Sequence, residues 1–254
     1  YTLNMKKVEL AVRRVIEGAQ AIVIPVDRQI LHVLSKEFSV DDQTGIKDPV
    51  GMSGVRLEAE VHIITGSSTS IQNMMKSVSR SGYQYRDIVF NPLASADAVL
   101  SRDEKELGVA LVDIGGGTTD IIVYIDGGVA YSSVIPVGGI HVTNDISIGL
   151  RTPLESAEMI KKQYGCAVLD LVDPSEMVEV PSVGGRAPRR LFRQELTQII
   201  EPRMTEMMEM INHELLKSGK KEMLAAGLVI TGGGALIEGS VESAERVLNM
   251  PTRV

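Results

Sequence analysis

The sequence has little of what several functional classes require, beginning with cysteine and paired histidines. Its one cysteine, Cys166, can form no disulfide within the chain and supplies no Cys-x-x-Cys metal or redox pair, which agrees with a reducing compartment. The four histidines are far apart, and none has the His-x-x-x-His spacing that places two imidazoles on one helix face: His32, His62, His141 and His213. We therefore expect Cys166 to be a small core residue and the histidines to bind no metal.

Long apolar runs and an excess of basic residues are missing as well. No apolar stretch approaches the ~18–20 residues of a membrane-spanning helix. The 254 residues carry 26 Lys and Arg against 33 Asp and Glu, so the formal net charge is −7. Nucleic acids require a basic face, and repulsion discourages non-specific binding to anionic lipid. We expect no nucleic-acid partner, and the length allows two domains.

The most informative stretch is an apolar run that ends in a glycine-rich turn, Val109-Ala-Leu-Val-Asp-Ile-Gly-Gly-Gly-Thr-Thr-Asp120. Gly115, Gly116 and Gly117 can adopt positive φ and bring backbone N–H groups close to an anion, as in phosphate nests. Asp113 would lie at the end of the strand, where it suits a hydrated Mg²⁺. Residues 121–125 are apolar again, so the pattern predicts a strand, a turn and a second strand. A P-loop or a dinucleotide fingerprint is followed by a helix instead, so neither motif is present. An ordinary hairpin turn is the alternative for this stretch alone.

A second apolar run ends in three glycines, Gly227-Leu-Val-Ile-Thr-Gly-Gly-Gly-Ala235, and a helix-like segment follows over residues 236–248. Gly232, Gly233 and Gly234 repeat the arrangement of the first turn. Two such turns favour one ligand held from two sides.

These two turns resemble those of the superfamily of actin, the heat-shock chaperones and the sugar kinases. Residues 91–99 are similar to the helix that connects the two lobes of that superfamily. Residues 137–146 are similar to the turn and helix that follow its second hairpin. Within the superfamily, essentially the whole chain resembles the FtsA family of actin-like cell-division proteins. Residues 46–58 look like the insert domain of that family, called IC, and residues 181–190 and 200–203 are also similar to it.

The resemblance implies an α/β fold with actin-like (ribonuclease H-like) ATPase lobes and a small inserted α/β domain. We expect residues 1–65 to form the IC-like domain, 66–92 the remainder of the first lobe, and 93–254 the second lobe. We also expect an internal piece of a longer protein, without the first phosphate loop and without the C-terminal amphipathic helix through which such proteins bind the membrane.

The resemblance also implies a site for ATP and Mg²⁺. Asp113 would orient Mg²⁺ through water, the turn glycines 115–117 and Thr118 would donate to phosphate oxygens, and Thr119 would add its hydroxyl. Gly232, Gly233 and Gly234 would pack against the adenosine and α-phosphate. Glu195 is a candidate for the ribose hydroxyls, although an ordinary solvated glutamate is the favoured interpretation.

Hydrolysis is where the sequence departs from an active ATPase. The superfamily typically has a glutamate before the proline of the connecting helix, and this chain has Asn91. An asparagine cannot take a proton at neutral pH and so cannot act as a base. We expect at most a weak ATPase, with Asp97 as an alternative acid that points elsewhere.

The function implied by the resemblance is nucleotide-dependent assembly. FtsA-like proteins form filaments on the cytoplasmic face of the cell membrane, tether the FtsZ ring and recruit later division proteins in septum formation. Two alternatives are a PilM-like pilus-assembly module and a small-molecule kinase, for which only Asp120 is an evident substrate acid or base.

Hydrophobic periodicity gives a coarse set of elements. We expect helices over 6–19, 67–81 and 142–150, and another that begins with Thr152 as N-cap and ends near Tyr164. We expect strands over 30–40, 55–65 and 87–90, and a loop over 174–188. A long helix over 191–216 should break near Pro202, with its methionines more often core filler than a partner-binding surface.

Overall fold

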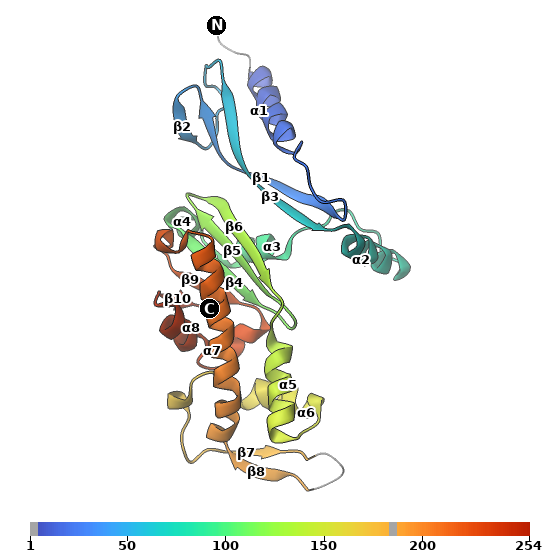
Figure 1. Ribbon diagram of the computed structural model, residues 1–254, viewed down its shortest axis with the longest axis vertical. Helices are drawn as coiled ribbons and strands as arrows, with labels where there is room; N and C mark the ends of the chain where they lie inside the picture. Colours follow the sequence, from blue (N-terminus) through green and yellow to red (C-terminus); the bar gives the residue numbers. More distant parts are fainter. Residues whose placement is uncertain (1–4, 183–186) are drawn as a thin grey trace.

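A mixed five-stranded sheet forms the centre of the structure (Figure 1). The computed structural model describes residues 5–182 and 187–254. The strands β4 (Val109–Ile114), β5 (Thr119–Ile125) and β6 (Gly128–Ile135) are antiparallel, and β9 (Leu228–Thr231) and β10 (Thr252–Arg253) continue the sheet parallel to β4. The order is β10-β9-β4-β5-β6. The expected α/β class is confirmed.

Both faces of this sheet are covered. Ala110, Val112 and Ile114 belong to a large buried cluster with residues of α5 (Gly139–Leu150), α7 (Arg193–Lys217) and α8 (Ser240–Leu248). Val109 and Leu111 point to the other face, where a smaller cluster includes residues of α3 (Asn91–Val99). Burial on both faces explains why β4 is a continuous apolar run and not an alternating one.

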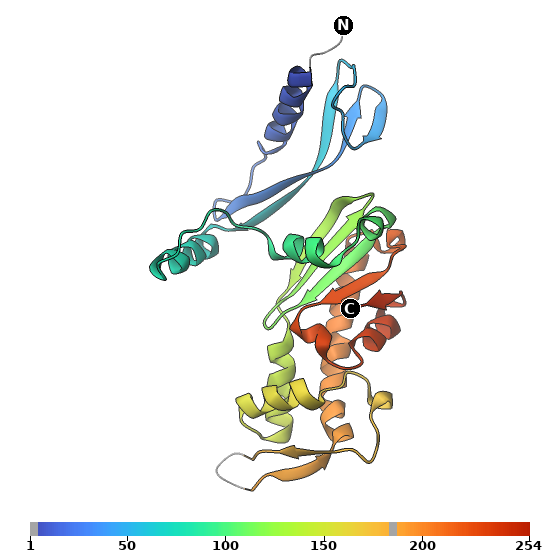
Figure 2. The same cartoon turned by 180° about the vertical axis from the view of Figure 1, so that it is seen from behind.

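A separate three-stranded antiparallel sheet lies at the N-terminal end of the structure (Figure 2). Its order is β2-β1-β3, with β1 at Arg28–Val40, β2 at Gln43–Ile46 and β3 at Leu57–Ser67, and α1 (Met5–Ala19) lies beside it. The two long strands match the expected ones. The short β2 lies between these two strands in the sequence and pairs with the end of β1.

The remaining elements connect these sheets and extend the second one. The helices α2 (Ser68–Arg80) and α3 follow β3, and α4 (Arg102–Leu107) precedes β4. The helix α6 (Leu154–Tyr164) follows α5, and a hairpin of β7 (Met177–Val180) and β8 (Arg189–Phe192) lies beyond them (Figure 1). Short 3₁₀ helices cover Leu169–Leu171, Lys221–Met223 and Gly233–Leu236.

The prediction that the long helix breaks near Pro202 is wrong, because α7 continues through it. Proline removes one backbone donor from the helix. Buried apolar side chains lie on both sides of it, from Leu196 and Ile200 to Met204 and Leu215, and their packing against the sheet and α8 offsets that loss. Most of the α7 methionines are core residues, as favoured, and Cys166 is also buried.

Four other local predictions are wrong. Residues 87–90 form no strand, and the N–H of Phe90 donates to Nε2 of His32 at 2.9 Å instead of joining a sheet. Thr152 does not cap α6, because its hydroxyl donates to the carbonyl of Pro181 at 2.6 Å. The segment 174–188 includes β7, which pairs with β8. The helix expected over 236–248 begins only at Ser240, after a 3₁₀ turn.

Candidate functional site

The two glycine-rich turns leave the same edge of the central sheet. The strands β4 and β9 are parallel neighbours, and Asp113 pairs in register with Thr231. The turn that starts at Gly115 follows β4 directly, and the turn that starts at Gly232 follows β9. The carboxyl ends of parallel strands meet at one edge of a sheet, so the two turns lie side by side.

The second turn approaches the end of β4 so closely that Gly232 and Gly234 have no room for a side chain. Gly232 has φ 85° and ψ 174°, a conformation that glycine adopts readily and other residues rarely do. A Cβ there would lie 2.6 Å from the carbonyl oxygen of Ile114 and even closer to a carboxylate oxygen of Asp113. A Cβ on Gly234 would lie 2.9 Å from Cβ of Ile114. These glycines therefore allow contact between the end of β4 and the second turn.

Both turns line one cavity of about 510 Å³. This volume falls within the roughly 300–1,000 Å³ that is typical of small-molecule sites. The lining residues come from both turns and from the starts or faces of α5 and α6: Gly115, Gly116, Gly139, Glu158, Lys161, Lys162, Gly233, Gly234, Leu236 and Ile237. The cavity therefore combines bare backbone, two lysines and an apolar wall.

The helix α5 holds the first turn in place. The N–H groups of Gly139 and Ile140, at its start, donate to the carbonyls of Gly115 and Gly116 at 2.9 and 2.8 Å. The N–H of Gly115 donates to the carbonyl of Thr118 at 2.9 Å, which closes the turn. A Cβ on Gly116 or its neighbour Gly117 would meet nothing within 4 Å, so the space beside them is open.

Two carboxylates face each other where the β4–β5 hairpin opens into this turn. Asp113 and Asp120 are directly paired across the hairpin. Oδ2 of Asp113 accepts hydrogen bonds from Nδ2 of Asn91 at 3.1 Å and from Oγ of Ser95 at 2.8 Å, so α3 is attached to the acid pair. Burial, and then the charge of Asp113, raise the pKa of Asp120, while hydrogen bonds from Asn91 and Thr118 oppose that rise. Such a pair of oxygen ligands fits a hydrated divalent cation.

A buried lysine network supports the other side of the cavity. Nζ of Lys161 donates to the carbonyl of Gly139 at 3.0 Å and to Oγ1 of Thr143 at 2.9 Å, and it lies 2.7 Å from a carboxylate oxygen of Glu158. Burial alone would raise the pKa of Glu158, but hydrogen bonds from Lys161, Thr143 and Lys162 hold it at about 2. Lys161 therefore connects α6 to the start of the helix that holds the first turn.

Three residues that line the cavity were not among the expected site residues: Glu158, Lys161 and Lys162. Their only signal was the spacing of an acid with two bases three and four residues later, which places all three on one helix face. Such pairs are common on solvated helices, so the spacing does not distinguish a cavity wall from a surface.

Two of the expected site residues lie elsewhere. The side chain of Thr119 is buried, and its hydroxyl donates to the carbonyl of Val137 at 2.8 Å, so its one proton is not available to a phosphate. Glu195 is exposed and accepts the N–H of Phe192 at 3.1 Å, as a cap at the start of α7. Neither of them is among the described residues that line the cavity. Asp113, Gly117, Thr118 and Gly232 are also outside that lining, although they belong to or adjoin the two turns that form it.

Residues 5–182 and 187–254 contain neither a cluster of metal-ligating side chains nor a membrane-spanning helix. No group of three or more His, Cys, Asp or Glu side chains there has the geometry to hold a metal ion. None of the helices in these residues is long and apolar enough to cross a membrane.

Two family models match the chain. One, described as cell division protein FtsA, matches residues 110–254, and the other, an SHS2 domain inserted in FtsA, matches residues 8–65. Together they cover most of the chain. The second match coincides with α1 and the three-stranded sheet.

Curated relatives named cell division protein FtsA match almost all of it. The relative from Pseudomonas aeruginosa is 48% identical over 243 residues, which are 96% of this chain and 58% of the relative. The relative from Escherichia coli strain K12 is 46% identical over 250 residues, 96% of this chain and 60% of the relative. The chain thus spans less than two thirds of the length of these relatives.

Solved structures with much lower sequence identity share the fold. MreB5 of Spiroplasma citri bound to ADP superposes with a TM-score of 0.62 at 21% identity, over 74% of this chain and 60% of that one. A PilM–PilN type IV pilus biogenesis complex gives a TM-score of 0.62 at 14% identity, over 98% and 62%. The expectation of an actin-like fold is confirmed.

Proposed function

The chain belongs to the FtsA family of cell division proteins, and on that premise we propose that it forms the ATP-binding part of a filament-forming division protein. The observation that carries the proposal is the common cavity of the two glycine turns, with the acid pair beside it. A nucleotide needs phosphate donors, a cation site and an apolar slot for its base, and the chain has residues of each kind here.

The proposed placement of ATP follows the chemistry of the cavity wall. The turn of Gly115, Gly116, Gly117 and Thr118 takes the β- and γ-phosphates, because the open space beside Gly116 and Gly117 suits an anion. The N–H of Gly115 closes the turn, so the N–H groups of the three residues after it are the proposed donors. The turn at Gly232, Gly233 and Gly234, followed by Leu236 and Ile237, takes the adenosine and α-phosphate.

The charged side chains complete this placement. Asp113, with Asp120, fits a hydrated Mg²⁺, which when bound would neutralise charge on the phosphates. Lys162 is 71% exposed at the cavity and can attract the anionic ligand, whereas Lys161 is engaged in the buried network. Glu158, which lines the cavity, is the proposed acid for the ribose hydroxyls in place of Glu195.

We propose slow hydrolysis at most. The amide of Asn91 is bound to Asp113 and cannot accept a proton, so it activates no water. Asp97, the alternative acid, is paired with Lys105 at 2.8 Å. The ligand therefore acts as a conformational switch more than as a substrate.

We propose the same division of the chain that the sequence suggests. Residues 1–65 are the IC-like insert, 66–92 the remainder of a first lobe, and 93–254 a second lobe. The match of an inserted SHS2 domain to residues 8–65 and the continuous core around the five-stranded sheet support this division.

The biological role proposed for the whole protein is that of the family. ATP closes a cleft between two lobes, the closed form favours head-to-tail contacts, and a contact that does not close on itself gives a filament. The filament lies on the cytoplasmic face of the cell membrane, held by the amphipathic helix that the family resemblance implies, and there it tethers FtsZ and recruits later division proteins. The PilM-like alternative rests on fold alone, and the kinase alternative on Asp120 alone.

The test uses the full-length protein. ATP with Mg²⁺ should bind in a calorimetric titration. Asp113→Ala should weaken the affinity at least tenfold, while Glu242→Gln, at an exposed position of α8, should not change it. Vesicles with FtsZ should then recruit the two proteins together, and electron microscopy should show filaments. No ATP binding, or a peptide partner without filaments, would refute the proposal.

A further inference from the structure

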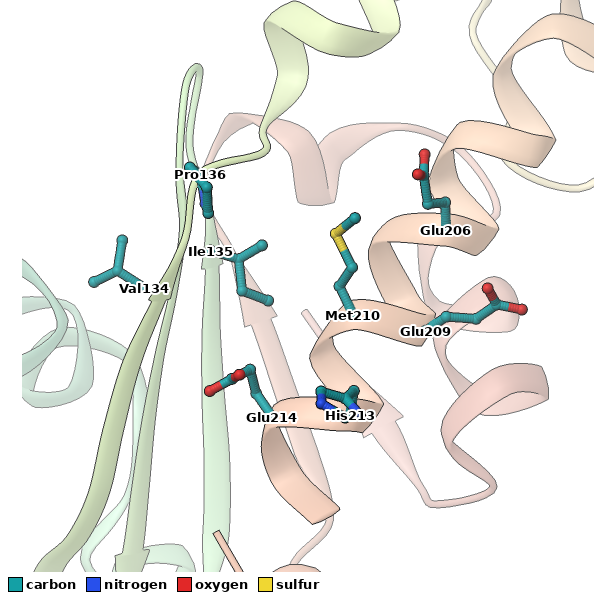
Figure 3. A pocket seen from close by; sticks show the side chains of 8 residues that line it. All are labelled: Val134, Ile135, Pro136, Glu206, Glu209, Met210, His213 and Glu214. Carbon is teal, nitrogen blue, oxygen red and sulfur yellow. The ribbon is translucent and has the colours of Figure 1, made fainter. Parts of the chain in front are cut away.

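A second pocket, unrelated to the cavity of the glycine turns, lies between the end of β6 and the middle of α7 (Figure 3). Its volume is about 430 Å³. The strand side supplies three residues and the helix side five: Val134, Ile135 and Pro136, and Glu206, Glu209, Met210, His213 and Glu214. None of these lines the other cavity. The pocket is at the lower end of the roughly 300–1,000 Å³ of small-ligand sites, which suits one or two side chains.

The inner walls of this pocket are apolar. Ile135 is buried, and Met210 packs partly against the large core cluster, so both offer a fixed surface. Val134 is 49% exposed, and its side chain points away from the helix (Figure 3), so it borders the pocket through its backbone. Because Figure 3 shows the strand and the helix facing each other across the space, an aliphatic stem that enters it contacts both walls.

One carboxylate at the pocket is held in a fixed orientation. An oxygen of Glu214 accepts hydrogen bonds from Oγ of Ser133 at 2.6 Å and from the hydroxyl of Tyr131 at 2.7 Å. These bonds lower the pKa of Glu214, so it is ionised at neutral pH. Its other oxygen lies 3.3 Å from Nζ of Lys217, a weak contact because that lysine is 63% exposed.

The other acids of the rim outnumber the cations beside them. Arg203 forms ion pairs with both Glu206 and Asp145, so its one positive charge does not neutralise both carboxylates. Glu209 is exposed and makes no ion pair with the part of the chain that the structure describes. The rim therefore keeps a negative charge over an apolar interior.

We infer that this pocket is a docking site for a short basic segment of a partner protein, in which an arginine lies beside an apolar residue. The methylene stem and the apolar neighbour contact the walls at Ile135 and Met210, and the guanidinium reaches the fixed carboxylate of Glu214, while the charge of Glu209 on the outer rim attracts it. Arginine fits the pocket better than lysine, because its planar guanidinium can donate two parallel hydrogen bonds to one carboxylate. A long cation over apolar walls with its charge at an acidic rim satisfies both surfaces at once.

The test measures fluorescence anisotropy with the full-length protein. The probe is a labelled nine-residue peptide of glycine and serine with a central Leu-Arg-Leu, and its partner peptide carries glutamate in place of the arginine. The arginine peptide should bind more tightly, and binding should weaken with salt, as expected for partly exposed charges. Glu209→Gln should weaken it about threefold, the scale of one exposed ion pair. Met210→Ala, which removes part of the apolar wall that faces Ile135, should weaken it by a similar factor.

Glu242→Gln is the matched control, because it removes an exposed glutamate from a different helix, α8. It should leave peptide binding unchanged, and all three variants should bind ATP as the wild type does. Equal binding of the two peptides, or equal effects of Glu209→Gln and Glu242→Gln, would overturn the inference. So would a loss of self-association in Glu209→Gln without any change in peptide binding, because the occupant would then be a second copy of the chain.

Discussion

Replacing Gly232 with alanine should unfold the protein at a clearly lower temperature than replacing its neighbour Gly233. The backbone at Gly232, with φ 85° and ψ 174°, lies in a region that costs a residue with a side chain about 1–3 kcal/mol. The new Cβ would also lie 2.6 Å from the carbonyl oxygen of Ile114. That oxygen belongs to a buried strand, so relieving the overlap costs about 1–3 kcal/mol more.

Together these effects predict a loss of about 2–6 kcal/mol for Gly232→Ala, which lowers the melting temperature by at least about 4 °C in a chain of this size. A Cβ on Gly233 meets nothing within 4 Å. Gly233→Ala should therefore leave stability unchanged or raise it by about 0.4–1 kcal/mol, through the unfolded state.

Thermal unfolding followed by circular dichroism at pH 7 measures both variants, and an ATP titration of the folded proteins follows. Because the methyl group of Gly232→Ala also displaces the carboxylate of Asp113, this variant should bind ATP with Mg²⁺ more weakly than the wild type. Equal melting temperatures for the two variants would show that the second turn does not press against the end of β4, and the reasoning would be refuted.

Three further substitutions test the surroundings of the site. Lys161→Met should lower the free energy of unfolding by about 3 kcal/mol, because it leaves the half-buried Glu158 with only the exposed Lys162 as a cation and removes the donor to Gly139 and Thr143. The exposed Lys162→Met should change it by less than about 0.5 kcal/mol in urea denaturation. Arg253→Met should cost about 1 kcal/mol at pH 7, since the pair is partly exposed. Hydrogen bonds from Arg253 hold the pKa of Glu104 at about 2, below its usual 4.5, so the difference from wild type in pH-dependent unfolding should shrink from pH 4.5 downwards and vanish below about 2. Asn91→Asp should destabilise by about 1–2 kcal/mol at pH 7, because it exchanges a hydrogen bond to a carboxylate for repulsion, and stability titrations that show no recovery in acid would contradict this.

Much of the fold could be predicted from local patterns. The apolar run of β4, the glycine turn and the resumed apolar run of β5 depend on residues that are neighbours in the sequence, and all three lie where expected. The helical periods of α1, α2 and α5 were likewise visible. Prediction failed at Pro202 and Thr152, where local propensity competes with packing or with a partner 29 residues away.

The sequence by itself determined that this chain has two bare-backbone turns after apolar strands, an acid before the first of them, and no base at position 91. Each of these features depends on the conformational freedom or side-chain chemistry of a few consecutive residues. Only the tertiary structure decided that the turns line one cavity, that Lys161 supports it, and that Thr119 and Glu195 are engaged elsewhere. The physical reason is that these contacts join segments far apart in the chain, and their geometry is fixed by the packing of helices on both faces of the central sheet.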